Sequence, residues 1–192
     1  MNLAIISQDV WLSRLEDPDR PDYAVFDLDP SPALPFEAVV TAALRLHELL
    51  EEYRVPHGVK TSGVSGLHIY VPVMNTDYST TRMFVKQFAS TVAARYPRLA
   101  TVTRMIQRRG RRVYLDPDQN MRAKTMSAPY SARHSVFAGV SAPLTWKELQ
   151  NGARPEDFTL LTMPERLRDV GDLWASLHRR PLDLGRLLRK AA

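Results

Sequence analysis

Two aspartates spaced two residues apart close an apolar run, and this spacing favours metal chemistry. The run over 23–28 reads YAVFDL and includes Asp27, while Asp29 follows it and precedes a proline. Side chains two apart on a strand point the same way, so both carboxylates would project from one face at the strand's end. A divalent cation would relieve their repulsion, and a third acid would complete a site for two metal ions. In the alternative interpretation, an aspartate before proline only closes a turn.

A second apolar run supplies a candidate for the third acid. The sequence VYL over 113–115 is followed by Asp116 and Pro117. Asp116 would therefore end its strand as Asp27 does, and could join it from a neighbouring strand. Asp118 is the rival, but it lies beyond Pro117 in the expected turn, where a solvated acid or a capping residue is the ordinary interpretation.

A glycine-containing loop between two other apolar runs could bind phosphate. The sequence over 60–68 reads KTSGVSGLH. Its glycines would let backbone N–H groups converge on phosphate oxygens, and Ser62, Ser65 and His68 would add side-chain donors. A plain hairpin turn also uses glycine, and a single histidine on a strand is commonly a structural residue, so both interpretations stay open.

Basic residues are concentrated in one segment of a chain whose net charge is only +5. Between Thr101 and His134 there are eight arginines and lysines but only two acids. Such a segment could neutralise the phosphates of a nucleic acid, although a basic run can equally be a solvated face. The eight residues are Arg104, Arg108, Arg109, Arg111, Arg112, Arg122, Lys124 and Arg133.

Composition bounds the class of protein. The 192 residues, 44% of them hydrophobic, suit one compact domain, so we expect a single domain over 1–192. The absence of cysteine excludes disulfides, thiol catalysis and cysteine-ligated zinc, and oxygen ligands would favour magnesium or manganese. No run approaches the roughly 18 to 20 apolar residues of a membrane span, and the first residues lack the features of a signal peptide. We therefore expect a cytoplasmic protein with no membrane partner.

The apolar spacing predicts an α+β fold, in which helices pack against a mixed or antiparallel sheet. Strands are expected over 23–28, 58–61 and 67–73, and helices over 35–53 and 79–96. The inner face of the second helix should carry Met83, Phe84, Phe88, Val92 and Tyr96.

The rest of the chain is less regular. A hairpin with Gly110 at its centre is expected over 104–115, with 111–115 as its second strand. Two helices are expected over 145–150 and 164–178, the first of them capped by Thr145.

Taken in order, these motifs resemble the polymerase domain of bacterial DNA ligase D, a member of the archaeo-eukaryotic primase superfamily. The resemblance runs through DRPDYAVFDLDP (19–30), KTSGVSGLH (60–68), VYLD (113–116), Gln119 with Arg122, and Thr125 with APYSAR (128–133). It continues through Val140, Ser141, Pro143, Leu144, Trp146 and PERL (164–167). Ordered motifs across most of a chain are far more specific than any one of them. The resemblance implies a primase-polymerase core with an RRM-like sheet.

The resemblance also implies roles for particular residues. Catalytic metal ligands would be Asp27, Asp29 and Asp116. The incoming nucleotide and its triphosphate would be held by Ser62, Gly63, His68, Gln119 and Arg133, with Ser65 adding a hydroxyl from the same loop. Nucleic-acid contacts would come from the basic segment, through Arg108, Arg109, Arg111, Arg122 and Lys124.

The implied activity is metal-dependent nucleotidyl transfer. Two divalent ions, manganese or magnesium, would assist attack of a primer 3′-hydroxyl on the α-phosphate of a ribo- or deoxyribonucleoside triphosphate. The substrates would be DNA or DNA/RNA primer-template ends in repair by non-homologous end joining, which places the protein at the bacterial or archaeal nucleoid. Two alternatives stay open: a noncatalytic module that binds nucleic-acid ends or nucleotides, and a metal-dependent phosphodiesterase. Release of pyrophosphate would separate transfer from hydrolysis.

Three departures from the family pattern bear on these expectations. The family domain usually carries further residues before this segment, which hold the pocket for a downstream 5′-phosphate, so a ligase or end-binding partner would supply that part. Ser65 stands where relatives often have a lysine or arginine. Asp9 and Val10 replace the family's usual His-Pro. We therefore expect weak nucleotide affinity.

Overall fold

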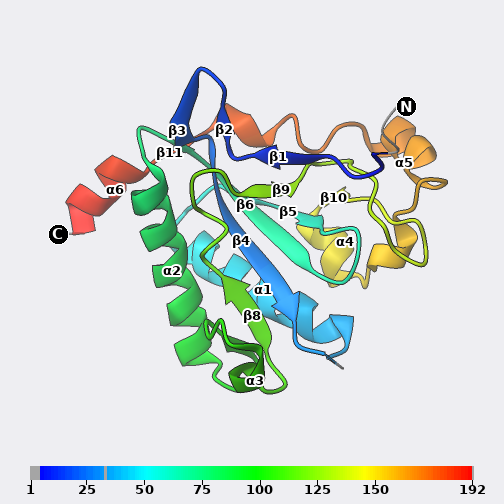
Figure 1. The fold of residues 1–192 in the computed structure, drawn as a ribbon, viewed down its shortest axis with the longest axis horizontal. Coiled ribbons are helices and arrows are strands. Elements are labelled where there is room, and N and C mark those ends of the chain that lie inside the picture. Colours follow the sequence, from blue (N-terminus) through cyan, green and yellow to red (C-terminus); the bar gives the residue numbers. More distant parts are fainter. Residues whose placement is uncertain (1–4, 33, 192) are drawn as a thin grey trace.

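A mixed seven-stranded sheet organises the computed structural model, which describes residues 5–32 and 34–191 (Figure 1). Its central strand is β4 (Tyr23–Pro30), which pairs antiparallel with β6 (Leu67–Met74) on one side and β8 (Val113–Asp116) on the other. The apolar run that predicted a buried strand therefore lies in the middle of the sheet.

The remaining strands extend the sheet on both sides of this centre. β5 (Gly58–Thr61) pairs antiparallel with β6, and β10 (Pro143–Leu144) lies beyond it. β7 (Ala100–Thr101) runs parallel to β8, and β11 (Leu182–Asp183) runs parallel to the end of β6. The prediction of an α+β fold with a mixed sheet is confirmed.

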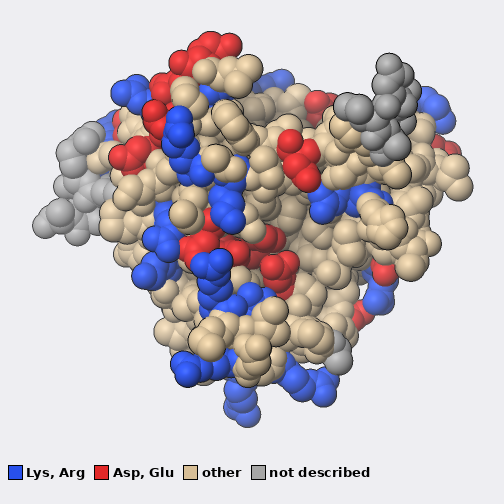
Figure 2. Space-filling model, viewed as in Figure 1, with Lys and Arg blue, Asp and Glu red and all other residues tan. Residues whose placement is uncertain are grey.

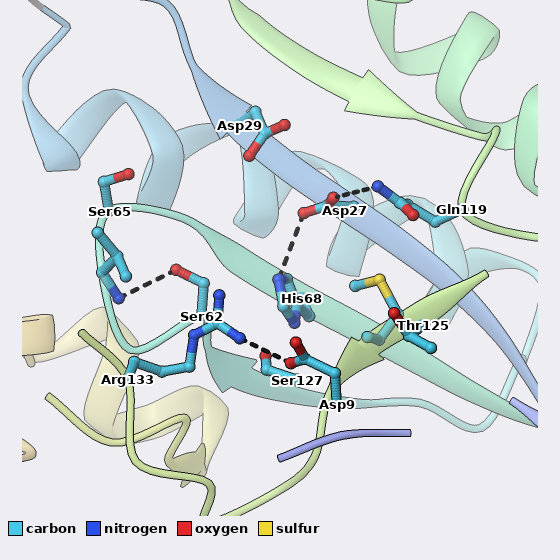
Figure 3. A pocket seen from close by; sticks show the side chains of 12 residues that line it. Asp9, Asp27, Asp29, Ser62, Ser65, His68, Gln119, Thr125, Ser127 and Arg133 are labelled. Atoms are coloured by element: carbon cyan, nitrogen blue, oxygen red, sulfur yellow. Dashed lines mark hydrogen bonds and ion pairs between the residues drawn. The ribbon is translucent and has the colours of Figure 1, made fainter. Parts of the chain in front are cut away.

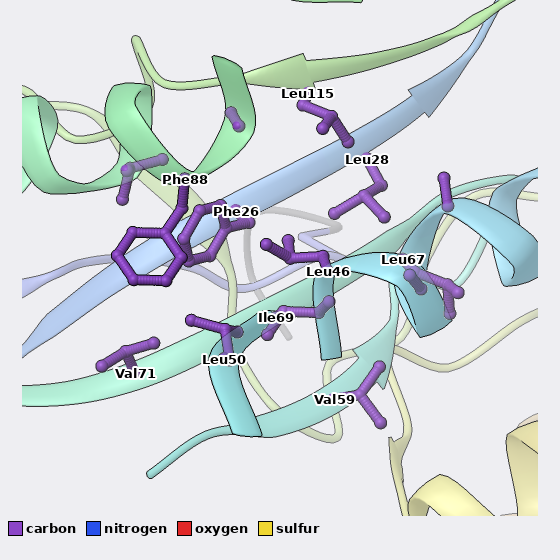
Figure 4. Close-up of a cluster of buried hydrophobic side chains, with 14 of the residues drawn as sticks. Phe26, Leu28, Leu46, Leu50, Val59, Leu67, Ile69, Val71, Phe88 and Leu115 are labelled. Atoms are coloured by element: carbon purple, nitrogen blue, oxygen red, sulfur yellow. The ribbon is translucent and has the colours of Figure 1, made fainter. Parts of the chain in front are cut away.

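Two long helices cover one face of the sheet and form the main core with it. α1 (Phe36–Glu52) and α2 (Tyr78–Arg95) both bury apolar side chains against β4. The alternation of β4 sends Phe26 and Leu28 into this core, as Figure 4 shows. Phe26 packs edge-on against the rings of Phe84 and Phe88 from α2, at centroid distances of 6.2 and 6.4 Å.

The opposite face of the sheet is covered by a short ribbon. β1 (Asp9–Trp11) pairs antiparallel with β9 (Thr125–Ser127), next to the small hairpin of β2 (Ser13–Arg14) and β3 (Asp17–Pro21). A second, smaller apolar cluster fixes the ribbon to the sheet, and it consists of Leu12, Val25, Tyr70, Tyr78 and Met126. Residues of β4 at odd positions therefore face this ribbon, whereas even positions face the helices.

Short helices complete the fold: α3 (Ile106–Arg109), α4 (Trp146–Gln150), α5 (Met163–Val170) and α6 (Leu184–Ala191), with 3₁₀ turns at Pro155–Asp157 and Leu177–Arg179. The predicted cap of α4 is confirmed, because the Thr145 hydroxyl accepts from the Glu148 N–H in a capping box. Among the residues that the structure describes, no helix has the length and apolar character to cross a membrane.

The predicted hairpin over 104–115 is wrong. Its first half is the helix α3, and β8 pairs with β4 and β7 instead. The Arg112 guanidinium donates to the carbonyl oxygens of Arg108 and Arg109, and so satisfies the end of this short helix. Gly110 then turns the chain with φ of 59°.

Two details of the predicted helices are also wrong. The helix expected over 164–178 ends at Val170, because Gly171 adopts φ of 71° and Asp172 begins a new turn by accepting from the Trp174 N–H. Met83 is 56% exposed, since the buried stripe of α2 passes through Thr81 and Phe84 instead. The other long helices and strands lie within two residues of their predicted bounds.

Asn120 extends the sheet beside the end of β8. It is fully buried, and its side chain accepts from the Val25 N–H at 2.8 Å and donates to the Val25 carbonyl at 2.7 Å. The side chain therefore replaces a neighbouring strand at the point where β8 has begun to leave β4.

We expect Asn120→Ala to lower the free energy of unfolding by about 2 to 4 kcal/mol, because two buried backbone groups lose their partners. Urea denaturation followed by circular dichroism measures the change. The matched control is Asn151→Ala at an exposed position, expected to cost less than about 0.5 kcal/mol. Equal effects of the two substitutions would show that the Asn120 side chain does not support the sheet.

Candidate active site

A row of polar residues crosses the sheet on the face that carries the ribbon. Asp27 of β4 lies opposite Asp116 of β8 on one side and opposite His68 of β6 on the other, and His68 lies opposite Lys60 of β5. Residues opposite each other in antiparallel strands share a face, so all four side chains project the same way. Asp29 projects beside them from two residues further along β4. The three acids singled out in the sequence are thus brought together.

Hydrogen bonds orient the carboxylate of Asp116. Its Oδ1 accepts from the Tyr114 hydroxyl at 3.0 Å and from the Asp118 N–H at 2.7 Å. The Asp118 side chain turns away to an ion pair with Arg82. Figure 2 shows the resulting acidic patch at the centre of this face, over β4 and β8, with basic side chains around it.

His68 links Asp27 to a buried lysine. The Lys60 ammonium donates to His68 Nδ1 at 2.9 Å, and His68 Nε2 lies 3.3 Å from Asp27 Oδ1. An ammonium can only donate, so Nδ1 must accept, and the proton of the neutral ring sits on Nε2 facing the carboxylate. Burial, followed by the charge of Lys60, holds the pKa of His68 well below its usual range, which favours this neutral form.

Lys60 is fully buried and also donates to the hydroxyls of Ser127 and Ser141. Burial lowers the pKa of Lys60 to about 7, against the opposing attraction of Asp27. A buried cation that keeps three polar partners is strongly held in position. The sequence analysis did not assign Lys60 a role. Its position eight residues before His68, across the turn of one hairpin, could have indicated that the two side chains lie together.

Burial and repulsion from neighbouring carboxylates raise the pKa values of Asp27 and Asp29. The pKa of Asp27 rises to about 8, first because of burial and then because of Asp29 and Asp116. Burial, followed by the charge of Asp116, also raises the pKa of Asp29. The oxygen atoms of the three aspartates form a hard ligand set that fits Mg²⁺ or Mn²⁺. Without a cation, their mutual repulsion disfavours the state in which all of them are charged.

A cavity of about 280 Å³ opens beside these acids (Figure 3). Five of the residues predicted to hold a nucleotide line it together with Asp27 and Asp29: Ser62, Ser65, His68, Gln119 and Arg133. Gln119 also donates to Asp27 Oδ2 at 3.3 Å. Residues that the sequence reasoning did not assign to the site also line the cavity: Asp9, Val64, Thr125, Met126 and Ser127.

The glycine loop is shaped by Ser62 and Gly63. The Ser62 oxygen accepts from the N–H groups of Val64 and Gly66, so the loop closes on its own side chain. Gly63 has φ of 81°, and a Cβ there would lie 2.4 Å from the Arg133 side chain. Glycine is therefore required both for the turn and for the approach of Arg133 to the cavity.

Arg133 is paired with Asp9, an acid that also lines the cavity (Figure 3). Its Nη1 donates to Asp9 Oδ1 at 2.8 Å and to the Ser7 hydroxyl at 3.0 Å. Asp9 belongs to the ribbon strand β1, which brings it across the sheet from a distant part of the sequence. The cation that faces the cavity is therefore partly neutralised within the protein itself.

The basic residues expected to contact nucleic acid lie outside this cavity. Arg108, Arg111, Arg122 and Lys124 are exposed, and Arg122 pairs with Asp19 at 2.6 Å. Arg109 lies over the Tyr114 ring, 3.8 Å from its centroid. Its charge offsets part of the rise in the pKa of Asp29. Only Arg109 of these five is thus tied to the acid cluster.

Comparison with known proteins reveals extensive similarity. A family model described as the LigD primase-polymerase domain matches residues 1–174. The chain is 34% identical over 166 residues to the bifunctional non-homologous end joining protein LigD of Bacillus subtilis, covering 85% of this chain and 27% of that protein. It is 34% identical over 169 residues to the multifunctional non-homologous end joining protein LigD of Mycolicibacterium smegmatis, covering 85% and 22%. The chain thus spans about a quarter of the length of these relatives.

A solved structure has the same fold. The polymerase domain from Mycobacterium tuberculosis ligase D, in complex with DNA, superimposes with a TM-score of 0.77 and 29% sequence identity. The match covers 84% of this chain and 56% of that chain.

The raised pKa of Asp27 should make the free energy of unfolding depend on pH when no metal ion is bound. Between its unfolded value of 3.8 and its folded value of about 8, the folded chain keeps a proton that the unfolded chain has lost, so stability falls as pH rises. Lys60, with its pKa lowered to about 7, has the opposite effect, but only above that pH. The fall should therefore be seen between about pH 4 and 7.

We expect Asp27→Asn to remove this dependence and, at pH 7 in a chelator, to raise the free energy of unfolding by at least about 1 kcal/mol, the worth of one pKa unit. Urea denaturation of both proteins across this pH range is the measurement. Asp169→Asn, on the exposed surface of α5, serves as the control. A lower stability of Asp27→Asn at pH 7 would contradict the prediction.

Proposed function

Because the chain belongs to the LigD primase-polymerase domain family, we propose that it is a metal-dependent nucleotidyltransferase that extends the 3′ end of a nucleic-acid strand. The observation that carries this proposal is the meeting of Asp27 and Asp116 across β4 and β8, with Asp29 beside them and a polar cavity in front. The relatives named for end joining suggest DNA repair at broken ends as the setting, in the cytoplasm at the nucleoid.

Asp27, Asp29 and Asp116 would hold two divalent ions, Mg²⁺ or Mn²⁺. The mutual repulsion of these neighbouring carboxylates, of which Asp27 is buried, and their all-oxygen chemistry support this assignment. When bound, such ions supply Lewis acidity at the reacting phosphate and neutralise the charge that develops there. The chain's own part is to orient the carboxylates: His68 and Gln119 contact Asp27, and the Tyr114 hydroxyl donates to Asp116.

The cavity would hold a ribo- or deoxyribonucleoside triphosphate. Arg133 offers a guanidinium for phosphate oxygens, and Ser62 and Ser65 line the same cavity with their hydroxyls. Gly63 would contribute by leaving room for the Arg133 side chain. In the reaction, the primer 3′-hydroxyl would attack the α-phosphate and release pyrophosphate. His68 and Gln119 line the cavity and also contact Asp27. A nucleotide that touches these two side chains would therefore also affect the position of the Asp27 carboxylate.

The nucleic acid would approach over the basic surface beside the acid cluster. Arg108, Arg109, Arg111, Arg122 and Lys124 would neutralise backbone phosphates there, and exposure of most of them supports that role. The partners would be DNA or DNA/RNA primer-template ends. Recognition of a downstream 5′-phosphate would come from further sequence or from a ligase or end-binding protein.

Extension of a labelled primer-template with Mn²⁺ tests this function. We expect the wild type to add nucleotides and release pyrophosphate, and Asp27→Ala and Asp116→Ala to reduce the rate by at least about 1000-fold, because each removes a metal ligand. Asp169→Ala is the matched control and should extend normally. Metal-dependent nucleotide binding without extension would favour the noncatalytic module, and strand cleavage without pyrophosphate would favour the phosphodiesterase.

The position of Asp9 leads to a second prediction, about the KM for the nucleotide. Because Asp9 neutralises Arg133 and adds negative charge to the cavity, we expect Asp9→Asn to lower the KM for the nucleotide about fivefold, equivalent to ~1 kcal/mol. Steady-state extension kinetics measure the change. In an Arg133→Ala background the same substitution should have a much smaller effect, since the paired cation is gone. An unchanged or higher KM for Asp9→Asn would contradict this explanation.

A further inference from the structure

A cluster of two histidines and a glutamate lies away from the proposed active site, where α1 gives way to β5. His47 and Glu51 are one helical turn apart near the end of α1, and His57 follows in the turn before Gly58. One ligand atom from each of the three lies within 4.8 Å of the others. The turn is tight, because Arg54 adopts φ of 53° and the Val55 N–H donates back to the Leu50 carbonyl.

We propose that His47, Glu51 and His57 bind one divalent ion of the zinc class, such as Zn²⁺, Co²⁺ or Ni²⁺, at a site separate from the carboxylate cluster. Two imidazoles and one carboxylate form a ligand set that zinc commonly takes, with further positions left for water. Nitrogen ligands favour these ions over Mg²⁺, whereas the three aspartates favour the reverse.

Hydrogen bonding prepares His57 to be a ligand. Its Nδ1 lies 2.7 Å from the Val55 carbonyl oxygen, so Nδ1 carries the proton and donates it there. The unprotonated Nε2 accepts from the Nδ1–H of His47, also at 2.7 Å, and an ion bound between the two rings would replace that proton. A backbone carbonyl that fixes the far nitrogen is the usual support of a metal-binding histidine.

The two rings are held in place by an aromatic neighbour. Trp146, at the start of α4, stacks on His47 with a centroid distance of 4.0 Å and meets the His57 ring edge-on at 5.3 Å. The His57 side chain is only 1% exposed. The packing against Trp146 therefore keeps the two imidazole rings next to each other.

Small adjustments would complete the site. Zinc–nitrogen bonds of about 2.0 to 2.1 Å place two ligand nitrogens ~3.3 Å apart in a tetrahedron, so the rings must separate by about half an ångström. His47 is only partly buried and can move by that amount. The Glu51 side chain is 65% exposed, and its Oε1, which lies 3.9 Å from His57 Nδ1, can rotate toward an ion at Nε2. The ion would then tie the end of α1 to the start of β5.

Titration of the full chain with zinc chloride, followed by calorimetry in excess Mg²⁺, tests this proposal. Magnesium occupies the aspartates, so one zinc ion per chain is expected to bind at the histidines. His47→Gln and Glu51→Gln should each weaken zinc binding at least tenfold. Asp27→Asn and the control His134→Gln, at an exposed histidine, should bind zinc as the wild type does.

Thermal unfolding provides an independent readout. Zinc should raise the melting temperature of the wild type and of His134→Gln, and raise that of His47→Gln far less. His47→Gln is preferred to a change at the buried His57, which could unfold the chain. Wild-type zinc affinity in His47→Gln, or loss of zinc binding in Asp27→Asn with retention in His47→Gln, would overturn the proposal.

Discussion

The placement of three carboxylates side by side on one face of a sheet, with one of them buried, is the constraint on which the rest of this structure depends. Asp27 is only 7% exposed and has Asp29 and Asp116 beside it, so its charged form is costly in the isolated chain. Within the protein, this cost is partly offset by the Lys60 ammonium of β5, whose charge acts to lower the pKa of Asp27. His68 of β6 lies between the two groups and contacts both. Lys60 in turn depends on the hydroxyls of Ser127 and Ser141, which belong to segments far along the chain.

The fold satisfies this constraint because each central strand sends apolar side chains to one face of the sheet and the polar side chains of the site to the other. Even positions of β4 enter the core between α1 and α2, and this apolar burial stabilises a sheet whose other face carries charge. Odd positions carry Val25, Asp27 and Asp29, of which Val25 joins the small cluster that fixes the ribbon. A shift of β4 by one residue would exchange the two faces, so the register with β6 and β8 specifies both the core and the site.

Much of this arrangement was predictable because its signals are local. The apolar runs around Asp27 and Asp116 and the glycine loop predicted strands that the structure confirms, and the alternation within β4 was enough to place two acids on one face. Three features escaped prediction because they depend on the register of strand pairs or on backbone geometry. The hairpin over 104–115 failed where Arg112 satisfies the carbonyls of a helix, which no periodicity reveals. Lys60 and Asp9 gained their places only through the pairing of β5 with β6 and of β1 with β9.

The pairing of Asp9 with Arg133 shows how a ribbon with few contacts to the core can set the properties of the cavity. The position of Asp9 follows from three residue pairs between β1 and β9, which carry it to within 2.8 Å of the cation that faces the cavity. Because that ion pair is only partly shielded from water, its strength is modest and responds to salt and to competing anions. A triphosphate brings far more negative charge than one carboxylate, so it can displace Asp9 from Arg133. Asp9 would therefore weaken the affinity of the cavity for a nucleotide without blocking it. The ribbon that carries Asp9 would in this way set the nucleotide concentration needed for binding.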